Sequence, residues 1–160
     1  MTAPHETDPA HLLFPRLRGF YARGETFSYA LLRAGFGLII LTHGIPKLLG
    51  LPHGSMADPL AGATRMIEMN LGLPFAPQLA IFITALETLG ALALAAGFLT
   101  RIFAPMFAIQ MLLICIALRA NFPWLDRGWE FPLVLGLIAL FLSMRGGGAW
   151  SVDRLMKREV

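Results

Sequence analysis

The sequence predicts an all-α membrane protein, a bundle of four transmembrane helices with a short amphipathic helix between the first and second spans. Four apolar stretches approach the roughly 20 residues that cross a hydrocarbon core about 30 Å thick. Hydrophobic residues make up 56% of the chain and charged residues 14%, against about 45–50% and about 25% in soluble proteins. Helices are expected because an isolated strand would leave backbone groups unpaired in lipid, and no stretch alternates as barrel strands do.

The predicted spans cover residues 27–49, 75–98, 102–118 and 129–144. They define a membrane domain over 27–146, between an N-terminal segment over 1–26 and a basic tail over 147–160. The N-terminal segment is polar and lacks the charged-then-apolar layout of a secretory leader, so we expect the first span to remain in the mature protein. The fourth span is short and carries Glu130 and Pro132 in its first turn, so its outer end should lie among the lipid head groups.

The distribution of Lys and Arg predicts the orientation. One side of the membrane, formed by both terminal segments and the turn between spans two and three, carries Arg16, Arg18, Arg23, Arg101, Arg145, Arg154, Lys157 and Arg158. The opposite side carries Lys47, Arg65, Arg119 and Arg127. Cytoplasmic segments are enriched in positive residues, so both termini are predicted to be cytoplasmic.

The connection between spans one and two contains a helix-start signature. Asp58 followed by Pro59 supplies an oxygen acceptor at the cap and Pro at the first helical position. Leu60, Ala63 and Ile67 then follow at helical spacing, and Leu71 continues the series. We interpret this segment as a short amphipathic helix on the outer surface, either partly roofing the bundle or serving as an ordinary surface helix.

Small residues predict where spans one and two approach each other. Ala91 and Ala95 are four residues apart on span two, and Gly37 and Gly44 lie on span one. Small residues at this spacing let helix backbones touch, which is the main packing device in lipid.

Two ionisable residues lie inside the predicted spans. Arg33 is about 9 Å inside the cytoplasmic end of span one, and Glu87 is near the middle of span two. A lone charge at the membrane centre costs about 2.5 to 3.5 kcal/mol on insertion scales, so we expect the two to pair with each other. The pair could be a structural ion pair that fixes helix register, or the polar wall of a ligand pocket.

Four further polar residues are expected near the outer leaflet: His43, Lys47, Arg119 and Glu130. Such a donor-rich cluster with a titratable imidazole could hold a carbonyl or an anionic head group and pass it a proton. The alternative is that charged residues at span ends extend to the interface and serve no ligand. Together with Arg33 and Glu87, these four form the candidate ligand-binding site, and no catalytic residue is assigned.

The remaining candidates have simpler interpretations. Gln110 is expected to hydrogen-bond across the bundle as a structural group. Cys115 is the only cysteine, which excludes an intrachain disulfide, and is read as a small buried hydrophobe. The histidines show no metal-ligand spacing, so no metal site is predicted. The net charge of +3 comes without a Lys/Arg run or a nucleic-acid motif, so no nucleic-acid partner is expected.

Several fragments, in order along residues 29–156, resemble the DoxX family of small membrane proteins. They are Leu-Arg-Ala-Gly at 32–35, Thr-His-Gly-Ile-Pro-Lys-Leu at 42–48, Leu-Glu-Thr-Leu-Gly at 86–90, Gly-Phe-Leu-Thr-Arg at 97–101, Gly-Trp-Glu-Phe at 128–131, and a stretch from Gly146 to Asp153. The resemblance implies a four-helix bundle in a bacterial plasma (inner) membrane. It also implies a link to redox systems, since named members include the membrane part of a thiosulfate:quinone oxidoreductase. Family members often have His where Arg119 stands, and Arg cannot exchange protons at neutral pH, so a relay through this position does not carry over.

These observations favour a quinone-interacting, redox-associated membrane subunit of an oxidoreductase system. It would have no intrinsic cofactor, a bound quinone, and a protein partner that carries the redox centre. The alternatives are a small-solute carrier or channel, with Arg33 and Glu87 as midplane groups and with homo-oligomerisation widening the pathway, and a non-catalytic membrane anchor for a soluble enzyme.

Overall fold

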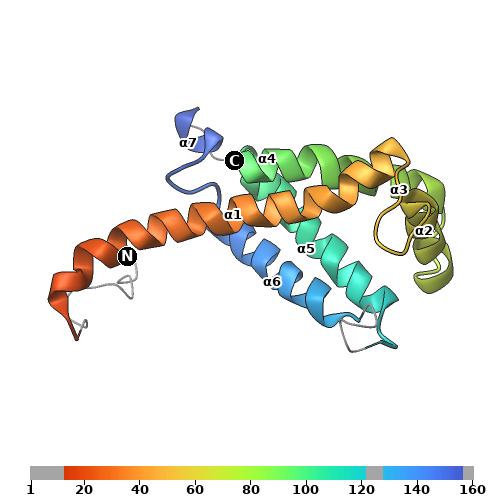
Figure 1. Cartoon of the computed structure of the whole chain (residues 1–160), viewed down its shortest axis with the longest axis horizontal. Coiled ribbons are helices and arrows are strands. Elements are labelled where there is room, and N and C mark those ends of the chain that lie inside the picture. Colours follow the sequence, from red (N-terminus) through yellow and green to blue (C-terminus); the bar gives the residue numbers. More distant parts are fainter. Residues whose placement is uncertain (1–12, 122–127, 157–160) are drawn as a thin grey trace.

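The computed structural model describes residues 13–121 and 128–156, and this part of the chain is helical without a strand (Figure 1). Its elements are the 3-10 turn η2 (Pro15–Leu17), the α-helices α1 (Arg18–Leu49), α2 (Pro59–Arg65), α3 (Ala76–Ala85), α4 (Ala91–Ala96), α5 (Thr100–Ala117), α6 (Glu130–Arg145) and α7 (Val152–Leu155), and two π-helical turns, η3 (Met66–Asn70) and η4 (Leu86–Gly90). Three of the cations used to predict the orientation, Arg127, Lys157 and Arg158, lie outside the described residues.

Within the described residues, three helices are long and apolar enough to cross a membrane: Pro15–Leu49, Ala76–Ala96 and Thr100–Ala117. The second is built from α3, η4 and α4 in direct succession. Helix α6 has 16 residues, about 24 Å, which is shorter than a hydrocarbon core of about 30 Å. An all-helical membrane architecture is therefore confirmed, while a count of four spans stays a prediction.

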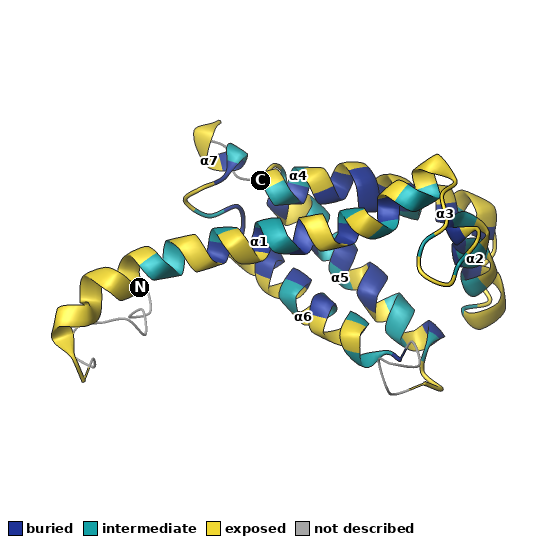
Figure 2. Ribbon diagram, in the orientation of Figure 1, coloured by how far each residue is buried: buried dark blue, intermediate teal, exposed yellow. Residues whose placement is uncertain are grey.

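The helices form two closely packed pairs. Figure 1 shows α1 running alongside α3 and α4, while α5 and α6 form a hairpin that crosses this pair obliquely. The main core lies between the pairs and contains Phe36 and Ile40 of α1, Leu94 of α4, Phe107 of α5 and Leu142 of α6. Figure 2 shows these inward faces as buried and the outer faces as exposed, as expected for helices surrounded by lipid.

Helix α1 begins at Arg18, nine residues before the predicted start of span one at Phe27. The prediction followed the apolar run, which charged residues interrupt at Arg23 and Glu25. Such residues are unfavourable in lipid but are good helix formers, so the helix continues where the apolar run stops. The added turns project beyond the bundle, with residues 18–23 exposed and 24–26 half-buried (Figure 2).

Helix α2 starts where the sequence predicts. The Asp58 carboxylate accepts a hydrogen bond of 2.9 Å from the Ala61 amide. Ala63 and Ile67 then pack with Ala80 of α3 in a second, smaller core. This packing fixes α2 and η3 against one end of α3.

Gly37 and Gly44 make the close approach predicted for spans one and two. A Cβ atom on Gly37 would lie 2.8 Å from the Cβ of Ala95, and one on Gly44 would collide with the backbone of Glu87. Backbone contact of this kind requires glycine, and it fixes the position of η4 along α1.

The segment after α6 folds back over one end of the bundle. The Asp153 carboxylate accepts hydrogen bonds from the amides of Leu99 (2.8 Å) and Thr100 (3.1 Å), and so caps the start of α5. The Asp153 amide in turn donates to the carbonyl of Gly97 at 3.0 Å. The tail is thereby joined to the turn between α4 and α5.

Candidate functional site

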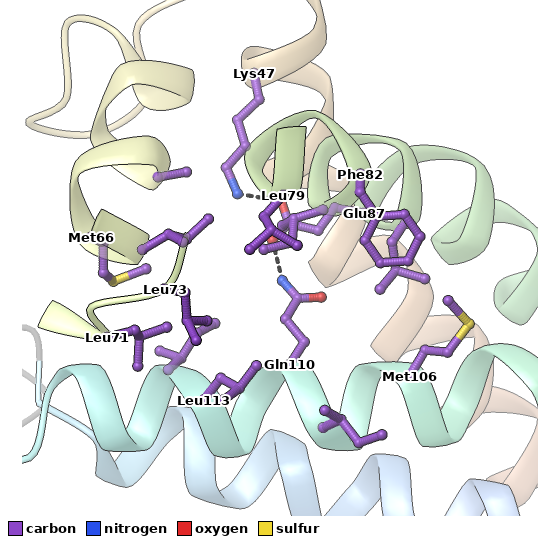
Figure 3. Close-up of a pocket in the computed structure, with 16 residues that line it drawn as sticks. Lys47, Met66, Leu71, Leu73, Leu79, Phe82, Glu87, Met106, Gln110 and Leu113 are labelled. Carbon is purple, nitrogen blue, oxygen red and sulfur yellow. Dashed lines mark hydrogen bonds and ion pairs between the residues drawn. The ribbon is translucent and has the colours of Figure 1, made fainter. Parts of the chain in front are cut away.

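A cavity of about 260 Å³ lies between η3, α3 and α5, bounded on one side by Lys47 of α1 (Figure 3). Its walls are almost entirely apolar, formed by Leu, Ile, Met, Phe and Ala side chains. The polar or charged residues among those lining it are Lys47, Glu87 and Gln110. Ligand sites have this composition, an apolar hollow with a few convergent polar groups.

These three side chains form one hydrogen-bonded cluster, to which we refer as the polar cluster. Glu87 Oε2 lies 2.5 Å from Lys47 Nζ, and Glu87 Oε1 accepts a hydrogen bond of 2.5 Å from Gln110 Nε2. Glu87 is buried, at 4% exposure, and the Lys47 side chain is exposed by only 11%. The cluster joins α1, η4 and α5, and its two formal charges cancel, which is how an ion pair is tolerated inside a membrane.

Both π-helical turns border this cavity. Glu87 belongs to η4, and Met66 and Ile67 belong to η3. A π turn adds a residue to the helical repeat, rotates the side chains that follow it, and is found often at functional sites. Neither turn was predicted from the sequence, because the spacing of apolar residues along a helix does not reveal one inserted residue.

The cavity is partly open, and three of its lining residues have outward-facing side chains. Leu73, Phe82 and Ile109 are exposed by 37%, 52% and 60%. Phe82 lies on α3 and Ile109 on α5, two helices that pack on other neighbours and hardly on each other. Since exposed apolar side chains on spanning helices are expected to face lipid, the side of the cavity at Phe82 and Ile109 should face the bilayer.

The expected pairing of Arg33 with Glu87 is wrong. The Arg33 guanidinium donates to the carbonyls of Gly147 and Trp150, the latter at 2.7 Å. It lies beside Gly97, which is ten residues, about 15 Å, along span two from Glu87. Each charge is buried, as predicted, but the returning tail supplies the partners of Arg33, and Lys47 supplies the partner of Glu87.

His43 lies on α1 one turn before Lys47, and its ring centroid is 4.9 Å from that of His53, which belongs to the loop after α1. His43 is half-buried and does not line the cavity. A role for it in ligand binding stays a prediction.

Arg119 and Glu130 lie at the ends of α5 and α6 and do not line the cavity either. Arg119 is exposed and Glu130 is half-buried. Their membership of a ligand site is also still a prediction. Gln110, in contrast, was interpreted as a structural group and turns out to complete the polar cluster. A lone amide in an apolar helix was the only sequence signal for it.

The described residues contain no group of three or more His, Cys, Asp or Glu side chains that could hold a metal ion. Cys115 is half-buried and its thiol donates to the Trp129 carbonyl at 3.5 Å. What the polar cluster offers is hydrogen bonding: a Lys47 ammonium has three donors, and a Gln110 amide has both donors and an acceptor.

Comparison with known proteins adds a family and one named relative. The DoxX family profile matches residues 28–120. The chain is 27% identical over 123 residues to the protein of Bacillus subtilis (strain 168) named "Putative oxidoreductase CatD", covering 77% of this chain and 82% of that protein. No solved structure matches at a significant level. The profile spans more than half of the chain and includes every residue of the polar cluster, so this protein belongs to the DoxX family.

Proposed function

We propose that this protein is the quinone-interacting membrane subunit of an oxidoreductase system, and that it holds the quinone ring in the cavity beside Lys47, Glu87 and Gln110. One observation carries the proposal: a buried, hydrogen-bonding cluster forms one wall of an apolar cavity that opens toward lipid. Such an opening suits a ligand that is itself dissolved in the bilayer.

The size of the cavity fits a single ring. An apolar cavity of about 150 Å³ holds one benzene molecule, and this one has about 260 Å³. It is slightly smaller than the roughly 300–1,000 Å³ of sites that enclose drug-sized ligands. The cavity therefore admits a substituted six-membered ring, while an isoprenoid tail would leave between Phe82 and Ile109 into lipid.

The polar cluster supplies groups that a quinone requires. A quinone carbonyl accepts hydrogen bonds, and Lys47 Nζ has donors beyond the one directed at Glu87. Electrons must come from elsewhere, because the single cysteine cannot form a redox couple. The proposal therefore includes a partner protein that carries the redox centre, and the oxidoreductase name of the Bacillus subtilis relative is consistent with it.

The proposed setting is the plasma membrane of a bacterium, with both termini in the cytoplasm. Helix α6 would be the fourth span, its short apolar length matched by local thinning of the bilayer or by flanking residues that extend to the interface. Helix α2 and η3 would form a short amphipathic helix at the outer surface, over the end of the cavity.

The carrier alternative required Arg33 and Glu87 to act together on a solute. Because Arg33 is bound to backbone carbonyls of the tail, about 15 Å along the helix from Glu87, the two do not form one site. An uptake assay in liposomes distinguishes the two functions, since a quinone subunit produces no solute flux.

Binding of decylbenzoquinone to the full-length protein in lipid nanodiscs, measured by isothermal titration calorimetry, tests the proposal. Lys47→Met removes the ammonium and should weaken binding about tenfold, the effect of one charge-assisted hydrogen bond. The matched control is Arg65→Met, which removes an exposed cation from α2 outside the cavity and should leave the affinity unchanged. Absence of binding to the wild-type protein would refute the proposed function.

A further inference from the structure

Three buried side-chain atoms in the described part of the chain have no hydrogen-bond partner: Arg33 Nε, Thr100 Oγ1 and Gln110 Oε1. Of these residues, Gln110 alone lines the cavity. It is 6% exposed, so its carbonyl oxygen is an acceptor shut away from water at the wall of a hollow. Buried polar atoms are nearly always paired, and an exception at a cavity wall indicates a missing partner.

The polar cluster fixes which end of the Gln110 amide is free. The Glu87 carboxylate can only accept, so Gln110 must direct its NH2 group toward it, and the reversed amide would place two oxygens 2.5 Å apart. The Gln110 carbonyl therefore points away from Glu87, on the side of Met106 (Figure 3). Small rotations about the last torsion of a Gln side chain cost little, so this oxygen can adjust toward a ligand while the NH2 group keeps its hydrogen bond to Glu87.

We infer that the cavity selects the reduced, hydroxyl-bearing form of its ring ligand, a hydroquinone whose phenolic O–H donates to Gln110 Oε1. The inference rests on the proposed function and specifies its ligand. A quinone presents acceptors alone and leaves Gln110 Oε1 unpaired, whereas a hydroquinone supplies the missing donor. A site built to pair with a hydroxyl group rejects an analogue that lacks it, because its own buried polar atom then stays unsatisfied.

The test compares three ligands that share one ring and tail: decylhydroquinone, its dimethyl ether and decylbenzoquinone. Affinities are measured on the full-length protein in nanodiscs under anaerobic conditions. The wild-type protein should bind the hydroquinone about tenfold more tightly than either of the others. In Gln110→Met, which keeps the side-chain length but removes the carbonyl, this ratio should fall to about one. Ser143→Ala is the matched control: it removes a buried hydroxyl on α6 away from the cavity and should keep the ratio.

A second variant tests the orientation of the amide. In Glu87→Gln the new side chain can donate as well as accept, so Gln110 can turn its NH2 group into the cavity. Selectivity should then shift from the hydroquinone toward the quinone. Equal wild-type affinity for all three ligands would overturn the inference and leave the proposed function standing, as would a ratio that survives Gln110→Met. If none of the three binds, the proposed function fails and the inference fails with it.

Discussion

Arg33 and Glu87 are both buried charges in spanning helices, but their surroundings differ. Arg33 is held by backbone carbonyls of the returning tail, at Gly147 and Trp150, and does not line the cavity. Glu87 is held by two side chains, Lys47 and Gln110, at the wall of a cavity. Backbone partners are fixed by the fold, whereas side chains can turn and exchange partners. Both charges are compensated for the loss of water. The partners of Arg33 serve stability, whereas those of Glu87 include side-chain groups that remain available to a ligand.

Removing Arg33 should have the largest effect on stability. Arg33→Met leaves the buried carbonyl of Gly147 and the part-buried carbonyl of Trp150 without their charged donor, which should lower the free energy of unfolding by roughly 3 kcal/mol. Arg145→Met is the control, because Arg145 pairs with Glu25 at a site where the two side chains are 38% and 35% exposed, and such pairs contribute about 1 kcal/mol or less. Unfolding in mixed detergent micelles, followed by circular dichroism, gives both values. Equal losses in the two variants would contradict a structural role specific to Arg33.

Variants of the polar cluster should have separate effects on protein stability and on ligand affinity. Lys47→Met alone leaves the buried Glu87 carboxylate without its counter-charge and should destabilise the protein by about 2 kcal/mol or more. Adding Glu87→Gln removes the charge that was left and should restore most of the stability, because losing both ions of a buried pair is often nearly neutral. Hydroquinone affinity should stay low in the double variant, which lacks both the Lys47 ammonium and the carboxylate that orients Gln110. Recovery of binding together with stability would show that the pair serves folding alone.

Gly44→Ala should lower both the stability and the quinone affinity, each by a smaller amount. The new methyl group would meet the backbone of Glu87, so η4 must move away from α1, at about 1–3 kcal/mol for overpacking. Because Glu87 moves with η4, the quinone affinity should fall as well. Gly35→Ala is the matched control on the same helix, since its added Cβ meets nothing within 4 Å. That control should change stability little, or raise it through helix propensity.

The positions of the long apolar helices could be predicted from the sequence because the extent of an apolar run largely decides them. The helices of the second, third and fourth predicted spans, Ala76–Ala96, Thr100–Ala117 and Glu130–Arg145, end within two residues of the predicted bounds. Two local features could also be predicted from the sequence: Asp58 caps α2, and Gly37 lies against Ala95. The start of α1 was missed because polar turns outside the membrane can remain helical.

The partners of the buried charges could not be predicted in the same way. Lys47 and Glu87 are 40 residues apart, and Arg33 and Gly147 are 114 apart. Which of these residues meet depends on the rotation of each helix about its axis and on the path of the tail. A π turn such as η4 inserts one residue into the helical repeat and so changes the direction of the side chains that follow it. Gln110 was undervalued for the same reason, since its role is defined only by its contact with Glu87.

The ring ligand should bind at the polar cluster and not beside Arg33. Photoaffinity labelling with an azidoquinone in native-like membranes, followed by mass spectrometry of the cross-linked peptides, locates the ring directly. Labels are expected on residues that line the cavity in η3, α3 and α5, such as Met66, Phe82 and Met106, and they should disappear when unlabelled quinone is added in excess. Labels that unlabelled quinone displaces around Arg33, Gly147 and Trp150, with none at the cavity, would refute binding at the polar cluster.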